Sequence, residues 1–208
     1  MLRYLRGEAG PSPRAALFLD RDGVLNRRIV DGYVIEPDDF ESIDVALDAA
    51  RAAQEAGAAL VVVSNQGAIG RGHATEAQIM TIHGLLIEAL SKHGIVVDGI
   101  YACPHHPKSS DPAQRDCECR KPKPGLILAA ARELNLDLAR SILIGDQPSD
   151  IAAARAAGIA EDRTLLIGGP DQLDPGQFVR NAWGESRSVE RKQNALRQSK
   201  DDMTARDV

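Results

Sequence analysis

Leu17-Phe18-Leu19-Asp20-Arg21-Asp22-Gly23-Val24-Leu25-Asn26 joins an apolar run to two aspartates that are one residue apart. The run, which begins at Ala15, predicts a buried parallel strand, because such strands are covered on both faces. Asp20 and Asp22 then lie at the carboxyl end of the strand, where open α/β sheets place their ligands. Two carboxylates there can share Mg²⁺, and an aspartate can also act as a nucleophile in phosphoryl transfer. Taken alone, the same stretch also fits a strand followed by a polar turn.

The composition excludes several classes of protein. The chain has 208 residues, of which 43% are hydrophobic and 26% charged, and its net charge is −5. This length suits one well-buried domain with at most a small insertion. An acidic chain has no basic field that would attract nucleic acid or a membrane surface. Aromatic residues make up only 3%, so the core must be built from Ala, Leu, Ile and Val.

The termini and the cysteines predict a cytoplasmic protein. No apolar run approaches the roughly 20 residues that a membrane span needs. Met1–Arg14 contains three arginines but no apolar core, so it does not resemble an export signal. An odd number of cysteines, three, argues against a disulfide framework and favours a reducing compartment.

Apolar runs alternate with segments of helical spacing along the chain. The predicted strands are Ala15–Leu19, Ala59–Val63, Gly99–Ala102, Ser141–Ile144 and Thr164–Ile167. The predicted helices run from Ile43 to Gly57, from Thr75 to Gly94, from Pro124 to Leu134 and from Pro148 to Gly158. This alternation predicts an α/β fold with a parallel sheet and helices on both faces. We expect a flexible lead-in at residues 1–14, one domain at 15–183 and a disordered tail at 184–208.

Polar side chains follow four of the predicted strands. Asp20, Ser64, Cys103 and Asp146 each come directly after an apolar run. The carboxyl ends of parallel strands meet at one edge of a sheet, so these side chains should lie together. Carboxylate, hydroxyl and thiol groups gathered at one edge predict a functional site.

Asp20, Asp22 and Asp146 form the first candidate cluster. Three carboxylates from two strand ends would repel one another without a counter-ion, and Mg²⁺ would relieve that repulsion and neutralise a phosphate dianion. Asp150 lies one helical turn beyond Asp146. It fits two roles equally well: a metal ligand through water, or a charge in the positive first turn of a helix.

Ser64, Asn65 and Lys121 form the second candidate cluster. A hydroxyl, backbone N–H groups and an ammonium suit the equatorial oxygens of a transferring phosphoryl group. Ser64 also fits a simple strand terminator, and Lys121 an exposed basic turn. The prolines that follow Lys121, at 122 and 124, stiffen this turn and favour a positioned cation.

Cys103, His105, Cys117 and Cys119 form the third candidate cluster. Three thiolates and one imidazole complete a tetrahedral Zn²⁺ shell that leaves no open position for catalysis. His105 is preferred to His106 because it gives C-x-H paired with C-x-C. The metal would organise the zinc loop, residues 103–123, which otherwise lacks a hydrophobic core. Three unrelated free thiols are the alternative.

Taken together, these motifs resemble the haloacid dehalogenase (HAD) superfamily of aspartate-dependent phosphatases. Asp20-Arg21-Asp22-Gly23, Ser64-Asn65, Lys121 and Gly145-Asp146 with Asp150 resemble its four motifs in order. The zinc loop resembles that of the D-glycero-D-manno-heptose 1,7-bisphosphate 7-phosphatases and the related histidinol-phosphate phosphatases. Asp31-Gly32-Tyr33 and Ser64-Asn65-Gln66 favour the heptose branch. The resemblance implies a three-layer Rossmann-like core, and the chain between Asp22 and Ser64 is too short for a large cap domain.

The resemblance also implies a role for each matching residue. Asp20 would be the nucleophile and Asp22 the acid and base, while Asp20, the carbonyl of Asp22, and Asp146 would hold Mg²⁺. Ser64 and Lys121 would stabilise the phosphoryl group. The implied substrate contacts are Asp31, Gly32, Tyr33, Asn65, Gln66, Arg120 and Gln147.

Two positions depart from the family pattern. Members often carry Thr at the position of Val24, which should leave the chemistry intact. They usually carry Lys at the position of Gln147, so a cation near the phosphate or metal site is missing, which bears on substrate and anomer preference.

The leading hypothesis is a monomeric phosphatase that acts on a small phosphosugar. A heptose bisphosphate would place it in lipopolysaccharide precursor or related nucleotide-heptose synthesis. A histidinol-phosphate phosphatase and a non-catalytic, zinc-stabilised binding module are the alternatives.

Overall fold

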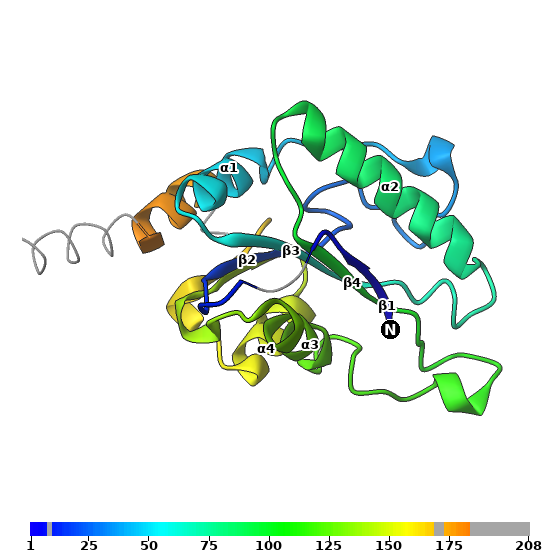
Figure 1. The fold of residues 1–208 in the computed structure, drawn as a ribbon. Coiled ribbons are helices and arrows are strands. Elements are labelled where there is room, and N and C mark those ends of the chain that lie inside the picture. The colour runs from blue at the N-terminus through cyan, green and yellow to red at the C-terminus, as the bar shows by residue number, and fades with distance from the viewer. Residues whose placement is uncertain (8–9, 169–172, 184–208) are drawn as a thin grey trace, which may run out of the picture.

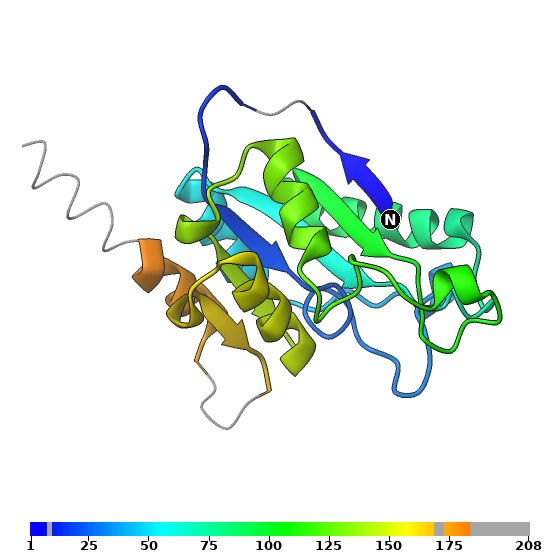
Figure 2. The same ribbon diagram turned by 90° about the horizontal axis from the view of Figure 1, so that it is seen from below.

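The computed structural model describes residues 1–7, 10–168 and 173–183, and its core is one six-stranded sheet. The strands are β1 (Leu2–Leu5), β2 (Ala16–Leu19), β3 (Ala59–Asn65), β4 (Gly99–Cys103), β5 (Ile142–Gly145) and β6 (Thr164–Leu166). They lie in the order β1-β4-β3-β2-β5-β6. All neighbouring strands are parallel except β1, which runs antiparallel to β4, as the arrows in Figure 2 show.

Helices cover both faces of the sheet, which confirms the predicted three-layer α/β fold (Figure 1). The helices are α1 (Leu47–Glu55), α2 (Glu76–Lys92), α3 (Gly125–Leu134) and α4 (Pro148–Ala157). Leu17 and Leu19 of β2 face a core made with α1, α2 and the helical residues 175–183. Phe18, between them, faces a second core made with α3 and α4. Alternation along a strand therefore divides the apolar residues of β2 between the two layers.

Local sequence signals set most helix ends. The predicted capping box at the start of α2 is present, because Thr75 Oγ1 accepts from the Gln78 N–H at 3.2 Å and the Gln78 side chain accepts from the Thr75 N–H. Gly158 ends α4 with a φ of 97°, a left-handed conformation that glycine adopts freely. Helix α1 begins at Leu47 rather than at the predicted Ile43. Tertiary contact explains the delay, since the Ile43 N–H donates to the Leu25 carbonyl oxygen at 3.1 Å.

The N-terminal segment corrects one expectation. Residues 1–14 were predicted to form a flexible lead-in, but Leu2–Leu5 form β1 and pair with β4 from Leu2 opposite Ala102 to Leu5 opposite Gly99. A short strand with a single buried residue, Leu2, carries little periodicity, so its stability comes from the edge of β4. The predicted all-parallel sheet therefore has one antiparallel edge strand. The predicted tail, residues 184–208, lies outside the described residues.

Between β2 and α1 the chain forms a loop with a single short 3₁₀ helix, Pro37–Asp39, and among the described residues there is no large cap domain. The site at the carboxyl ends of the strands is therefore covered by loops alone. In the part of the chain that the structure describes, no helix has the length and apolar character needed to cross a bilayer.

Candidate active site

The carboxyl ends of β2, β3 and β5 open into a cleft of about 450 Å³. The cleft is lined by every residue predicted to act in catalysis, in Mg²⁺ binding or in substrate binding, namely Asp20, Asp22, Asp31, Gly32, Tyr33, Ser64, Asn65, Gln66, Arg120, Lys121, Asp146 and Gln147. The parallel sheet thus brings together side chains that are up to 127 residues apart in sequence, as in Asp20 and Gln147.

Lys121 lies at the base of the cleft between two carboxylates. Its Nζ donates to Asp20 Oδ1 at 2.7 Å and to the carbonyl oxygen of Val63 at 2.8 Å, and it lies 2.7 Å from Asp150 Oδ1. Burial by itself lowers the pKa of Lys121, but Asp20 and Asp150 more than offset it and raise that pKa above its usual value. Lys121 therefore remains a charged ammonium.

The surroundings of the Asp20 carboxylate contain more negative than positive charge. Burial raises its pKa above the usual range, Lys121 opposes that rise, and the nearby carboxylates of Asp150 and Asp22 add to it. One ammonium thus compensates the buried carboxylates only in part. A divalent cation beside Asp20 would complete the compensation and keep this oxygen nucleophile ionised.

Asp22 is held by three side chains. Arg21 donates to both of its oxygens at 2.9 and 3.0 Å, Asn26 donates to Oδ1 at 2.9 Å, and Gln66 donates to Oδ2 at 3.0 Å. Burial alone would raise the pKa of Asp22, but the Arg21 charge and these hydrogen bonds hold it below the usual value. The carboxylate is therefore fixed in position and ionised at neutral pH.

Asp146 has one oxygen in use and one free. Its Oδ2 accepts from Arg28 at 3.1 Å and from Gln147 Nε2 at 3.2 Å. Its Oδ1 is buried and has no hydrogen-bond partner among the described residues. A buried, unpartnered carboxylate oxygen is costly, so this atom points to a ligand, and a hard cation fits it.

Asp20, Asp146 and Asp150 each place a carboxylate oxygen within 4.8 Å of the others, so the three together could hold a metal ion. Asp150 is the least available of them. Its Oδ1 is paired with Lys121, and its Oδ2 accepts from the Gln147 N–H at the start of α4. The geometry therefore favours the helix-end role for Asp150 and leaves Asp20 and Asp146 for the cation.

Two glycines allow the carboxylates to approach the strand ends. Gly23 has a φ of 93°, and a methyl group built on it would overlap the carboxylate of Asp146. A methyl group on Gly145 would overlap the side chain of Asp150. Both positions therefore need glycine, for close packing and, at Gly23, also for a left-handed backbone.

Ser64 and Asn65 act at the end of β3. Ser64 is 1% exposed, and its Oγ accepts from Gln66 Nε2 at 2.8 Å. The amide of Asn65 accepts from the Lys121 N–H and donates to the Lys121 carbonyl, each at 3.0 Å. Asn65 thus positions the backbone of Lys121, and the Lys121–Pro122 peptide bond that follows is cis.

Cationic side chains rim the outer part of the cleft. Arg71 donates to the hydroxyl of Tyr33 at 3.3 Å, and Arg120 donates to the carbonyl oxygen of His105 at 2.9 Å. These two guanidinium groups line the cleft together with the Asp31 carboxylate. The outer cleft therefore suits an anionic group.

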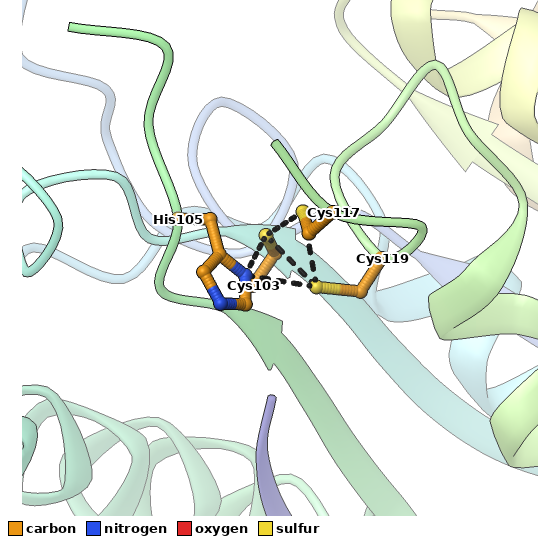
Figure 3. A group of neighbouring side chains, drawn as sticks. All are labelled: Cys103, His105, Cys117 and Cys119. Atoms are coloured by element: carbon orange, nitrogen blue, oxygen red, sulfur yellow. Dashed lines mark hydrogen bonds between the residues drawn. The ribbon is translucent and has the colours of Figure 1, made fainter. Parts of the chain in front are cut away.

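Cys103, His105, Cys117 and Cys119 converge beside the cleft (Figure 3). Cys119 Sγ lies 3.1 Å from Cys103 Sγ, 3.5 Å from Cys117 Sγ and 3.3 Å from His105 Nδ1. Zn–S bonds of about 2.3 Å place the sulfurs of a tetrahedral site about 3.8 Å apart. The cluster is therefore of the right size and donor type for a structural zinc ion.

This cluster is attached to the loop that follows β3. A Cβ on Gly70 would lie 2.8 Å from the Pro104 carbonyl oxygen, and the Gly70 N–H donates to that same oxygen at 2.8 Å. A Cβ on Gly67 would lie 2.8 Å from His106 and 3.1 Å from Arg120. The Gly-rich turn thus lets the zinc loop pack closely and bring Arg120 to the cleft.

Comparison with known proteins agrees with this geometry. The family model described as HAD-hydrolase-like matches residues 118–168. The D-glycero-beta-D-manno-heptose-1,7-bisphosphate 7-phosphatase of Yersinia pestis is 46% identical over 156 residues, which are 74% of this chain and 82% of the relative. The protein of the same name from Escherichia coli K12 is 44% identical over 156 residues, 74% and 81% of the two chains. The chain belongs to this family of HAD phosphatases.

A solved structure supports the family assignment. The crystal structure of D,D-heptose 1,7-bisphosphate phosphatase from B. bronchiseptica, complexed with magnesium and phosphate, is 31% identical to this HAD phosphatase. The match has a TM-score of 0.68 and covers 82% of this chain and 99% of that chain.

Several residues of this HAD phosphatase were missed by the sequence-based prediction. Arg21 is fully buried against Asp22, and Arg28 and Arg71 line the cleft. His83, buried on α2, has an Nε2 without a partner among the described residues. A charged Arg21 between two site aspartates was a usable signal. Arg28, Arg71 and His83 stand in a loop, a Gly-rich turn and a helix, and nothing in their spacing marks them.

Proposed function

We propose that this protein is a Mg²⁺-dependent phosphatase that removes the 7-phosphate of D-glycero-D-manno-heptose 1,7-bisphosphate. The observation that carries the proposal is the meeting of Asp20, Asp22, Asp146 and Lys121 in one cleft with a free Asp146 oxygen. The names of the relatives support the substrate, and their β-anomer supports the same anomer here. The magnesium and phosphate bound to the related crystal structure support the cofactor.

In the first step Asp20 attacks the phosphorus atom, an Asp20–phosphate bond forms and the bond to the sugar oxygen breaks. Asp20, the carbonyl of Asp22, and Asp146 would hold Mg²⁺, which neutralises phosphoryl charge when bound. Lys121 and Ser64 stabilise the phosphoryl oxygens. Asp22 gives a proton to the departing sugar oxygen, and the approach of the phosphoryl anion favours the protonated Asp22 that this step needs, because like charges repel.

In the second step Asp22, again ionised, takes a proton from water. The water oxygen attacks the phosphorus of the aspartyl-phosphate, and the bond between phosphorus and the Asp20 oxygen breaks. Inorganic phosphate leaves, and Asp20 is restored as a carboxylate. Arg21, Asn26 and Gln66 hold Asp22 in one orientation through both steps. The carboxyl group is therefore already placed for proton transfer.

The charge of the outer cleft favours a bisphosphate over histidinol phosphate. Apart from Asp20, Asp22, Asp146, Asp150 and the cations that contact them, the charged residues lining the cleft are Arg71, Arg120 and Asp31, so cations outnumber carboxylates there. A second phosphate group would be attracted there, whereas the ammonium group of histidinol phosphate would be repelled. We therefore assign substrate recognition to Asp31, Gly32, Tyr33 and Arg120, with Gln66 and Gln147 closer to the reacting phosphate.

We propose that the Cys103–His105–Cys117–Cys119 cluster binds structural Zn²⁺. The spacing of its atoms supports this assignment, as does the lack of a hydrophobic core in the loop it organises. The ion would fix the loop that carries Arg120 and Lys121. A reducing cytoplasm would keep the three thiols available as ligands.

The acidic net charge of −5 supports the absence of a nucleic-acid or membrane partner, and the proposed enzyme acts as a monomer.

The decisive experiment measures phosphate release, with Mg²⁺, from both anomers of the heptose bisphosphate and from L-histidinol phosphate. We expect a strong preference for the β-bisphosphate, and no release by the Asp20→Asn variant. Preference for histidinol phosphate would move the protein to that family branch. If the protein hydrolysed neither these substrates nor a generic phosphate ester, the alternative of a non-catalytic, zinc-stabilised binding module would be favoured.

A further inference from the structure

Arg28, from the loop between β2 and α1, contacts the Asp146 carboxylate of the candidate active site. It lies in the loop after β2, its side chain is 49% exposed, and its Nη1 donates to Asp146 Oδ2 at 3.1 Å. Among the described residues, no other acceptor for the Arg28 side chain is observed, although a guanidinium carries five N–H donors. Arg28 therefore has donors to spare beside the proposed cation site.

The other cations of the cleft contact other groups. Lys121 is held by Asp20 and Asp150, and Arg21 is fully buried against Asp22. Arg71 donates to the Tyr33 hydroxyl and Arg120 to the His105 carbonyl. Arg28 differs from both because it is the guanidinium that contacts Asp146 in the described part of the chain. A ligand entering the cleft can reach its remaining N–H groups without breaking another contact.

The residue after Asp146 is neutral. Gln147 Nε2 donates to the Asp146 carbonyl at 2.8 Å and to Oδ2 at 3.2 Å, so it helps to orient the carboxylate but brings no charge. Arg28 donates to that same Oδ2 from a different loop. The charge that the position of Gln147 lacks is thus present at the same atom, supplied from the β2–α1 loop.

We propose that Arg28 binds the phosphoryl group that is being transferred and is the cation that compensates for Gln147. This inference rests on the proposed phosphatase function. A divalent cation held by the free Oδ1 of Asp146 would attract the phosphoryl group to this carboxylate. Arg28 is already at the second oxygen of that carboxylate, and its planar fork suits phosphate oxygens.

The test is the affinity for inorganic phosphate, measured by titration calorimetry at saturating Mg²⁺ in the wild type and in Arg28→Ala. We expect the substitution to weaken phosphate binding by about tenfold to a hundredfold, as is usual for a charge-assisted hydrogen bond. Arg28→Lys should keep part of the affinity. Arg28→Ala combined with Gln147→Lys should recover much of the loss, because a cation returns beside Asp146.

A neighbouring arginine provides the matched control. Arg27 pairs with Glu41 on the surface, where both side chains are more than half exposed, and it does not line the cleft. Arg27→Ala should leave phosphate affinity unchanged. A separate titration with Mg²⁺ alone distinguishes phosphate binding from simple orientation of Asp146.

Two results would overturn the proposal. One is equal phosphate affinity in the wild type and Arg28→Ala. The other is a loss of Mg²⁺ affinity that accounts for the whole loss of phosphate affinity. A wild type that binds phosphate through Arg28 but hydrolyses no heptose bisphosphate supports the role of Arg28 and rejects only the heptose assignment, because inorganic phosphate carries no sugar.

Discussion

The two polar clusters of this HAD phosphatase differ in how their buried polar groups are compensated. The carboxylates Asp20 and Asp150 are compensated by a cation of the chain itself, the Nζ of Lys121, which lies 2.7 Å from both. The cluster of Cys103, His105, Cys117 and Cys119 has no such cation within the part of the chain that the structure describes, and its side-chain contacts are with its own members. The first cluster can therefore stay assembled without metal, whereas the second should depend on metal for its shape.

The clusters also differ in how they are tied to the fold. The carboxylates lie at the ends of β2 and β5 and at the start of α4, so the sheet fixes the distances between them. The Cys and His residues belong to one strand end and one loop. A change of charge in the first cluster should thus alter chemistry and the stability of the whole domain, while loss of metal from the second should first loosen a loop.

Asp20→Asn should have the largest effect on turnover. Asparagine preserves the acceptor for Lys121 but cannot attack phosphorus, so we expect a loss of at least about a thousandfold in kcat. Steady-state kinetics with a phosphate ester measures the loss. The thermal unfolding midpoint should stay close to that of the wild type, and a fully active variant would reject Asp20 as the nucleophile.

Lys121→Met should affect both activity and folding. It removes a phosphoryl-stabilising cation, for which we expect a loss of about 10²–10³ in turnover. It also leaves the buried Asp20 and Asp150 without their partner, which should lower the free energy of unfolding by about 3–5 kcal/mol. Kinetics and urea unfolding measure the two effects.

The comparison predicts a specific rescue of Lys121→Met. Because the carboxylates then lack any cation, added Mg²⁺ should raise the unfolding midpoint of Lys121→Met more than that of the wild type. Lys123→Met is the control, since Lys123 pairs with Asp116 and Glu118 on the exposed turn. Equal shifts in both variants and the wild type would mean that Lys121 does not shield the metal site.

Removal of zinc should have a smaller and more local effect on turnover. A chelator that prefers Zn²⁺, used with excess Mg²⁺, should release the 103–123 loop and reduce turnover about tenfold or more, because Arg120 loses its fixed place. Hydrogen exchange should rise in this loop before it rises in β2 or β5. Cys117→Ser should reproduce the effect, and unchanged exchange after chelation would show that the loop folds without metal.

The contrast between the clusters also explains what the sequence could predict. The Cys and His residues of the proposed zinc site lie within 17 residues, so their spacing alone groups them. Asp20, Ser64 and Asp146 could be predicted because apolar runs mark the strands that carry them. Arg28 could not, since its approach to Asp146 depends on the path of a loop. The same limit applies to β1, whose four residues are stabilised by pairing with β4 rather than by any pattern of their own.

Two histidines, His105 and His83, differ in their partners. His105 lies among sulfur atoms, whereas His83 is 2% exposed on α2 and its Nε2 has no partner in the described part of the chain. Burial, together with the Arg21 charge, lowers the pKa of His83 to about 3, although Asp22 opposes the shift. His83 is therefore neutral in the folded protein at neutral pH.

His83 should make the domain sensitive to acid, with the smallest effect of the set. Its folded pKa is below the unfolded value of about 6.5, so its contribution to stability is complete above pH 6.5 and is lost as the pH falls toward 3. At pH 4.5 the cost should be about 2–3 kcal/mol. Urea unfolding at pH 7 and at pH 4.5 should show a smaller loss for His83→Gln than for the wild type.

The comparison between the two proteins isolates His83 from other titrating groups. Asp20 has a raised pKa and thus acts in the opposite direction, and the thiols would lose a bound metal in acid. Both effects are common to the wild type and His83→Gln. His93→Gln, at the exposed end of α2, should behave as the wild type does. If all three proteins lost equal stability between pH 7 and 4.5, His83 would be able to take up a proton in the folded state. The Arg21–Asp22 pair would then lie in a wetter environment than its burial indicates.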